Sequence, residues 1–158
     1  MKKITVLLAL VLLTSTFSYG QTVLIRPDAG IGYLSADDIG EWTTNYGLKI
    51  HLSANEFQRY GIIVNHLFSP KNDQVSYLCT GLMIEQVLFN YFNMGIGTIG
   101  YINLVQIGEN PFGLYTHLGF EYKFSRHFNV MASYRSDFIF RRHFAMYNAF
   151  QLGFGIQL

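Results

Sequence analysis

The chain has 158 residues, of which 13% are charged and 16% aromatic, and its formal net charge is +1. Soluble domains carry about 25% charged residues, so a fully water-exposed surface is not expected. A charge so close to neutral also excludes nucleic acid as a partner, because nucleic-acid binding requires a concentrated basic surface.

The first residues have the pattern of a secretory signal peptide. Lys2 and Lys3 are followed by an apolar run over residues 4–13, and the small residues Ser18 and Gly20 precede Gln21. The apolar run is too short to cross a bilayer as a helix, and small residues at these positions favour cleavage. We therefore expect residues 1–20 to be removed after export and residues 21–158 to form one domain.

The remaining sequence alternates between apolar and polar residues. In the run 119–124, the aromatic residues 120, 122 and 124 alternate with Gly119, Glu121 and Lys123. A period of two is typical of a β-strand, whose successive side chains point to opposite faces. Similar runs begin at Gly47, Gly81 and Gly153, which indicates a hairpin unit repeated four times.

Alternation and turn residues together predict eight strands. In chain order these cover residues 23–34, 44–53, 57–68, 75–88, 92–105, 113–124, 128–138 and 147–158. Loops are expected at 36–43, 69–74, 108–111 and 139–146, and tight turns at 54–56, near Asn90 and at 125–127.

Strands of this length fit a membrane, because a tilted transmembrane strand needs about 9–11 residues. Closing eight antiparallel strands into a barrel also removes the two unpaired edges of an open sheet. The predicted fold class is therefore all-β, an eight-stranded antiparallel up-and-down transmembrane β-barrel.

The two faces of the predicted strands differ in charge. One face is apolar and free of Asp, Glu, Lys and Arg, whereas the other mixes glycines with charged residues. The charged set is Arg26, Asp28, Lys49, Arg59, Glu85, Glu121, Lys123, Arg135 and Asp137. A membrane barrel turns its apolar face to lipid and its polar face inward. We therefore expect these charges to pair and close the lumen, Leu82→Arg to block insertion, and Met83→Arg to be better tolerated.

The leader, the eight alternating strands and runs such as 119–124 with 128–135 resemble small outer-membrane β-barrel proteins of the OmpA/OmpX type. The resemblance covers essentially all of residues 21–158. It implies the outer membrane of a Gram-negative bacterium, with termini and short turns on the periplasmic side. The implied partners are outer-membrane lipid, lipopolysaccharide and the barrel-assembly machinery. Such proteins usually end in an aromatic residue, whereas this chain ends in Leu158.

Three inward residues form a candidate catalytic set: His117, Ser133 and Glu121. Ser, His and a carboxylate can form a hydrolase triad, and some barrels of this type are lipid A deacylases or acyltransferases. No His-x-Ser pair of the deacylase type is present, however, and a buried hydrogen-bonded network is the preferred interpretation. A structural or surface-interaction role is therefore favoured over a lipid A-modifying enzyme. A narrow pore is a second alternative, disfavoured because side chains fill an eight-stranded barrel.

The last loop carries the one basic cluster, Arg141, Arg142 and His143. Arginine makes charge-assisted bonds to phosphate, so these residues are candidates for contact with lipopolysaccharide phosphates. No metal site is predicted, because the histidines are scattered and Cys79 is the single cysteine. No cofactor is expected either: the G-x-G-x-x-G sequence at residues 95–100 lies inside a predicted strand, not at a strand-to-helix turn. The oligomeric state stays open.

Overall fold

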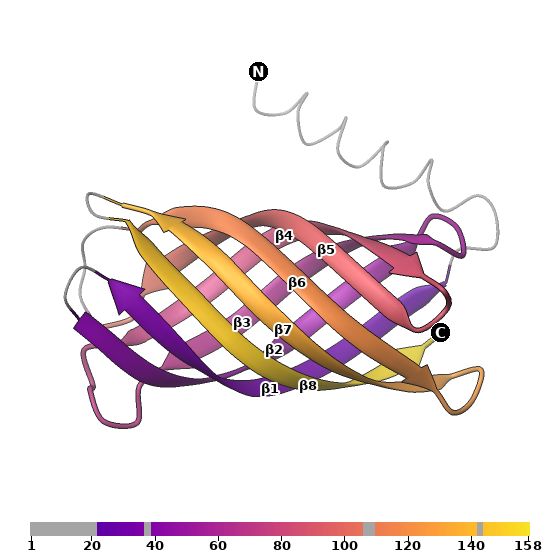
Figure 1. Ribbon diagram of the computed structural model, residues 1–158, viewed down its shortest axis with the longest axis horizontal. Helices are drawn as coiled ribbons and strands as arrows, with labels where there is room; N and C mark the ends of the chain where they lie inside the picture. The colour runs from indigo at the N-terminus through magenta and orange to yellow at the C-terminus, as the bar shows by residue number, and fades with distance from the viewer. Residues whose placement is uncertain (1–21, 37–38, 106–109, 142–143) are drawn as a thin grey trace, which may run out of the picture.

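The computed structural model describes residues 22–36, 39–105, 110–141 and 144–158 (Figure 1). The predicted signal peptide, residues 1–20, lies outside the described residues. No helix long and apolar enough to cross a membrane occurs in the part of the chain that is described.

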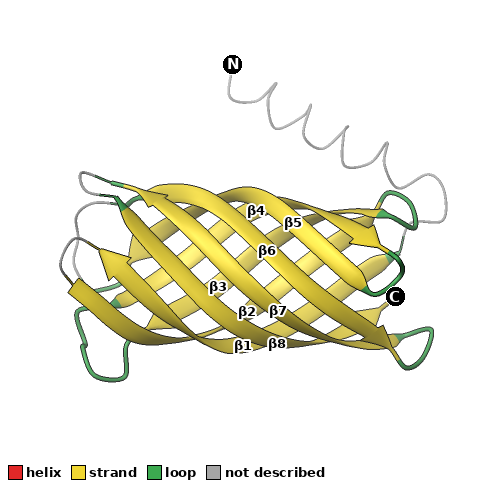
Figure 2. Ribbon diagram, viewed as in Figure 1, coloured by secondary structure: helices red, strands yellow, loops and turns green. Residues whose placement is uncertain are grey.

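The described residues form one closed barrel of eight strands (Figure 2). The strands are β1 (Val23–Ala36), β2 (Ile39–Ser53), β3 (Gln58–Phe68), β4 (Ser76–Leu88), β5 (Phe92–Asn103), β6 (Phe112–Lys123), β7 (Phe128–Phe140) and β8 (Ala145–Gln157). Each strand pairs antiparallel with its neighbour in sequence, and β1 closes the barrel by pairing with β8. This confirms the predicted fold class.

Two of the predicted loops are largely strand. β1 runs to Ala36 and β2 begins at Ile39, so most of the predicted loop 36–43 extends the β1–β2 ladder. Gly40 and Trp42 there indicated a loop by composition, yet they pair with Ser35 and Tyr33. At the last predicted loop, 139–146, β7 likewise continues to Phe140 and β8 begins at Ala145. Turn-forming residues were misleading here because ladder pairing with the neighbouring strand overrides local preference.

The two ends of the barrel have connections of different length. At one end lie the short turns 54–57, 89–91 and 124–127, and we call this the short-turn end. Phe89 and Asn90 have φ angles of 54° and 67° there, a left-handed conformation that tight turns use. The strand ends meet at the same end, where Val23 and Leu158 exchange backbone hydrogen bonds of 3.3 and 2.8 Å. The opposite end, which carries the segment 69–75, is the long-loop end.

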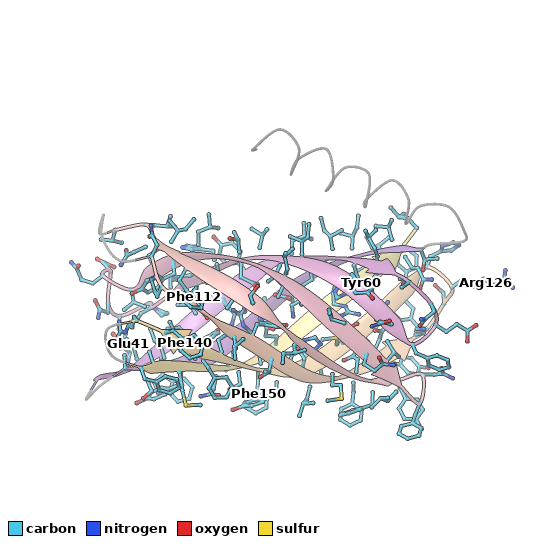
Figure 3. All side chains as sticks on the ribbon, turned by 90° about the horizontal axis from the view of Figure 1, so that it is seen from above. Glu41, Tyr60, Phe112, Arg126, Phe140 and Phe150 are labelled. Carbon is cyan, nitrogen blue, oxygen red and sulfur yellow. The ribbon has the colours of Figure 1, made fainter. Side chains whose placement is uncertain are left out.

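The outside of the barrel is apolar and the inside carries the charges. Leu82 is 64% exposed, whereas its neighbour Met83 is 3% exposed. Figure 3 shows side chains projecting from the wall along its whole length, Phe150 among them, with Glu41 and Arg126 toward opposite ends. Every charged side chain of the described strand residues occupies an inward position of the alternation. The predicted facing of the strands is thus confirmed.

Part of the interior is apolar, which the sequence did not predict. Toward the long-loop end a cluster of buried aromatic and aliphatic side chains fills the lumen. Its members include Ile63, Leu67, Cys79, Met83, Ile99, Tyr101, Tyr115, Ile139 and Tyr147. The charged residues lie beside and below this cluster, so the interior combines a packed core with ion pairs.

Candidate functional site in the barrel lumen

The largest group of charges lies toward the short-turn end and centres on Glu121 of β6. Arg26 donates to its Oε2 at 2.7 Å, and Arg59 donates to its two oxygens at 2.6 and 3.1 Å. Asn93 adds a fourth hydrogen bond at 3.2 Å. Because a carboxylate has about four acceptor sites, the hydrogen-bonding capacity of Glu121 is filled.

Glu85 of β4 is the second acceptor of this group. Arg59 donates to it at 2.8 Å and Arg26 lies 3.4 Å from its Oε2. Nε2 of His117 is 3.0 Å from the same oxygen, and Nδ1 of His51 is 3.9 Å from the other. We call Arg26, Arg59, Glu85 and Glu121 the lumen quartet.

The lumen quartet crosses the barrel. Its members come from β1, β3, β4 and β6, so the bonds from β1 and β3 to β6 join strands that are not neighbours in the sheet. Their side chains are between 0% and 6% exposed. Two positive and two negative charges balance, which offsets the large cost of removing each one from water.

A second group of charges, the pair Lys49 and Asp28, lies near the middle of the barrel. Nζ of Lys49 is 3.0 Å from Asp28 and donates to Gln151 at 3.0 Å. Gln151 donates in turn to Asn45 at 2.7 Å, and Asn65 donates to Asp28 at 3.0 Å. Arg135 donates to Asn65 at 3.0 Å, so the Asn65 amide links Arg135 to Asp28.

The third group of charges lies toward the long-loop end. Arg135 and Asp137, both on β7, form a pair with contacts of 3.0 and 2.5 Å, and Tyr101 donates to the same carboxylate. The Arg135 guanidinium lies 5.1 and 5.2 Å from the ring centres of Tyr115 and Tyr147. An aromatic cage of this kind stabilises a cation through the negative faces of the rings.

The structure brings eight of the nine predicted lumen charges together in these three groups. Lys123 is the exception and corrects the prediction: it occupies an inward position but is the last residue of β6 and is exposed at the barrel mouth. Alternation correctly gives the side of a strand but not how far along the barrel axis its end extends. Water therefore solvates Lys123 in place of a carboxylate.

The candidate catalytic residues are not assembled into a triad. Ser133 pairs with Gly119 and Gln151, whereas His117 pairs with Arg135. His117 contacts Glu85, and Glu121 is occupied by the two arginines. Among the described residues, no hydrogen bond joins Ser133 to His117.

The basic cluster of the last loop is only partly described. Arg141 is exposed directly after β7 at the long-loop end, while Arg142 and His143 lie outside the described residues. No group of three or more His, Cys, Asp or Glu residues suited to a metal ion occurs in the described ranges.

Sequence reasoning missed the polar residues that connect the charges. Asn45, Asn65, Asn93 and Gln151 all occupy inward positions, and all are buried. The signal was available, since a polar residue at an inward position of a narrow barrel needs a partner. The identity of each partner depends on distances across the lumen, which alternation along one strand does not contain.

Gly95 provides a test of the packing around His117. The two residues pair across β5 and β6, and a Cβ atom at Gly95 would lie 2.3 Å from the imidazole ring. Because Glu85 holds that ring, Gly95→Ala is expected to destabilise the barrel by about 1–3 kcal/mol. The control is Gly100→Ala on the same strand, where the nearest atom is 3.8 Å away. Equal urea midpoints for the two variants would contradict this packing.

Comparisons with solved structures identify barrels of the same architecture. Neisserial surface protein A (NspA) matches with a TM-score of 0.67 and 11% identity over 87% of this chain and 99% of that one. The N-terminal β-barrel domain of Pseudomonas aeruginosa OprF matches with a TM-score of 0.64 and 16% identity, over 87% and 97% of the two chains. Ail, the attachment invasion locus protein of Yersinia pestis, gives 0.55 and 12%, over 88% and 99%.

No family model and no curated protein matches the sequence. At these low identities the likeness concerns the fold alone, and the chain has the fold of eight-stranded outer-membrane β-barrels.

Proposed function

We propose that this chain is an integral outer-membrane protein of a Gram-negative bacterium with a structural or surface-interaction role and a lumen closed to solutes. The described strands carry no Asp, Glu, Lys or Arg on their outer face, their charges are turned inward, and the fold is that of outer-membrane barrels. Lipid is the solvent that suits such an exterior, because a water-soluble barrel places its charges outside.

The single observation that carries the closed lumen is the crossing of the lumen quartet. Arg26 and Arg59 reach Glu121 on a strand that neighbours neither of theirs, at distances of 2.7 and 2.6 Å. Toward the long-loop end, the cavity lined by Leu34, Tyr77 and Tyr101 holds about 20 Å³, room for a single water molecule. Side chains therefore fill the described interior both at the lumen quartet and toward the long-loop end.

We propose that the short-turn end, where the strand ends meet, faces the periplasm and that the long-loop end faces outward. Residues 1–20 would then act as the cleaved export signal, and the barrel-assembly machinery would insert residues 21–158.

This geometry favours neither rival function. A lipid A-modifying enzyme would require an assembled nucleophile and base, and Ser133 and His117 have different partners. A pore would require an open path along the lumen, whereas the lumen quartet crosses the lumen toward the short-turn end.

Reconstitution into a planar lipid bilayer tests the closed lumen. We expect the folded protein to give no steady ion conductance, because the quartet and the apolar cluster together fill the interior. The OprF N-terminal barrel, purified in the same detergent, serves as a comparison of the same architecture. A steady conductance in the wild-type protein that grows when Arg59→Ala is introduced would show that the quartet lines a path, contrary to the proposal.

For the surface role, we propose that Arg141 contacts the phosphates of lipopolysaccharide at the outer rim. Arg141 is exposed at the long-loop end, where an outer-leaflet headgroup would lie. Arg141→Ala is expected to weaken binding to lipopolysaccharide vesicles in a salt-dependent way, because the contact is charge-assisted. Co-flotation with those vesicles measures the effect, and Arg126→Ala at the opposite end is the matched control. Equal losses for both variants would contradict a contact at this rim.

A further inference from the structure

A shallow groove runs across the outer face of β1, β8, β7, β6 and β5, with a volume of about 860 Å³. Its floor is formed by two alanines, Ala29 and Ala132. Its walls are large apolar side chains, and they include Ile31, Phe92, Leu118, Phe120, Phe150 and Leu152. The register explains the shape: Ala29 pairs with Leu152, Leu152 with Ala132, and Ala132 with Phe120. Small residues alternate with large ones along this row, which leaves depressions between them.

A row of polar side chains borders the groove on its long-loop side. Tyr33 pairs with Asn148, Asn148 with Ser136, and Ser136 with Thr116, so β1, β8, β7 and β6 each contribute one outward residue. Apolar residues lie on both sides of this row, Phe138 and Met146 above it and Leu118 and Phe150 below it. We call Tyr33, Asn148, Ser136 and Thr116 the polar row.

Polar groups that face lipid must be hydrogen-bonded, because hydrocarbon offers no partner. Thr116 donates to the backbone oxygen of Ser136 at 2.9 Å. Ser136 and Tyr134 both donate to Oδ1 of Asn148, at 2.6 and 2.9 Å. Two donors thus fix the carbonyl side of the Asn148 amide.

The nitrogen side of the Asn148 amide differs from its carbonyl side. Among the described residues, no acceptor binds Nδ2 of Asn148, which carries two N–H donors. Asn148 is partly exposed on the outer wall and stands at the long-loop edge of the groove. The site therefore combines an apolar trough with a donor at one end, which is the chemistry of an acyl chain headed by its carbonyl.

We propose that this groove binds an acyl chain of lipid A, with the Asn148 amide donating to the ester or amide carbonyl at the head of the chain. The inference rests on the proposed outer-membrane orientation, which places the polar row toward the outer leaflet. A second copy of the barrel fits the groove poorly, because one convex wall would bridge the depressions over Ala29 and Ala132 without filling them. A flexible chain fills them.

A groove on the opposite side of the barrel provides an internal comparison. It holds about 780 Å³ and is lined by residues of β2 to β6, including Ile50, Ile62, Leu82 and Thr98. The polar side chains near it are those of Tyr60, Thr98 and Thr80, and within the described ranges none of the three forms a side-chain hydrogen bond with another outward residue. Similar apolar volume without a shared polar row makes this groove the matched control.

Native mass spectrometry of detergent-solubilised protein tests the proposal, with purified lipid A and phosphatidylglycerol added as separate probes. The wild-type protein is expected to retain lipid A. Asn148→Leu, which removes the donor, and Ala132→Phe, which fills the floor, are each expected to reduce retention about tenfold, equivalent to roughly 1.4 kcal/mol. Thr98→Val and Ile84→Phe, on the opposite wall, should retain lipid A as the wild type does.

Folded barrels show a heat-dependent shift in gel mobility, which is measured on every sample. This shift distinguishes a failure of the proposed function from a failure of the lipid site alone. A wild-type protein that shows no such shift in detergent or vesicles would overturn both the proposed function and the lipid site. Folded protein in which all variants retain lipid A equally would overturn the lipid site alone. Equal retention of phosphatidylglycerol would show that the groove takes any acyl lipid and would overturn its assignment to lipid A.

Discussion

Glu121→Gln is expected to lower the free energy of unfolding by about 3–5 kcal/mol, the cost of leaving a buried charge without its partner. The carboxylate is 1% exposed and accepts hydrogen bonds from Arg26, Arg59 and Asn93. Without its charge, two buried guanidinium groups share Glu85 as their single anion. No water reaches them to replace the lost interaction.

Urea unfolding in lipid vesicles measures this effect, with the fluorescence of Trp42 as the signal. Trp42 is the single tryptophan and is 64% exposed on the outer wall, so its emission reports whether it lies in lipid. Lys123→Gln is the matched control, because Lys123 occupies the same face two residues later but is exposed. Its effect should stay within about 0.5 kcal/mol. A loss of equal size for both variants would mean that the quartet does not hold the strands together.

Leu82→Arg is expected to destabilise the membrane-inserted state by about 2–4 kcal/mol, the cost of a basic side chain facing the middle of a bilayer. Leu82 lies at the centre of β4 and is 64% exposed on the apolar wall. Phe57→Arg is the control. Phe57 is 54% exposed in a short turn at the barrel end, where the same change costs about 0–1 kcal/mol.

The fraction of protein that becomes resistant to protease in vesicles, together with the urea midpoint, reports this difference. Leu82→Arg should reduce both, and Phe57→Arg should leave both close to the wild-type values. If Leu82→Arg instead made the protein more soluble and equally stable without detergent, the outer wall would face water and the proposed membrane location would be wrong.

Strand alternation made the wall of this barrel predictable from sequence. The period of two places Leu82 outside and Glu85 inside whatever the partners are, because a strand offers only two faces. The same rule located eight of the nine lumen charges. It could not separate Glu121 from Lys123, which share a face and differ only in depth along the barrel.

The interior partners were not predictable in the same way. Alternation treats Met83 as an inward position like Glu85, which led to the expectation that Met83→Arg would be better tolerated than Leu82→Arg. The structure changes that expectation, since Met83 is 3% exposed within the apolar cluster beside Ile63 and Ile99. An arginine there would enter a packed core. Whether an inward side chain meets water, a charged group or an apolar group depends on the register of all eight strands relative to one another. The sequence of a single strand does not determine that register.

The pairing order of the strands bears on how the chain acquires its fold. Seven of the eight ladders join segments adjacent in sequence, and each can form as a hairpin as soon as its second strand is available. The eighth, β1 with β8, joins the two extremities of the domain and cannot form until both outer strands are in place. Until then, both outer strands have unpaired backbone groups that hydrocarbon cannot satisfy. A chain shortened at its C-terminus would consequently keep two open sheet edges, and open edges pair readily with other chains.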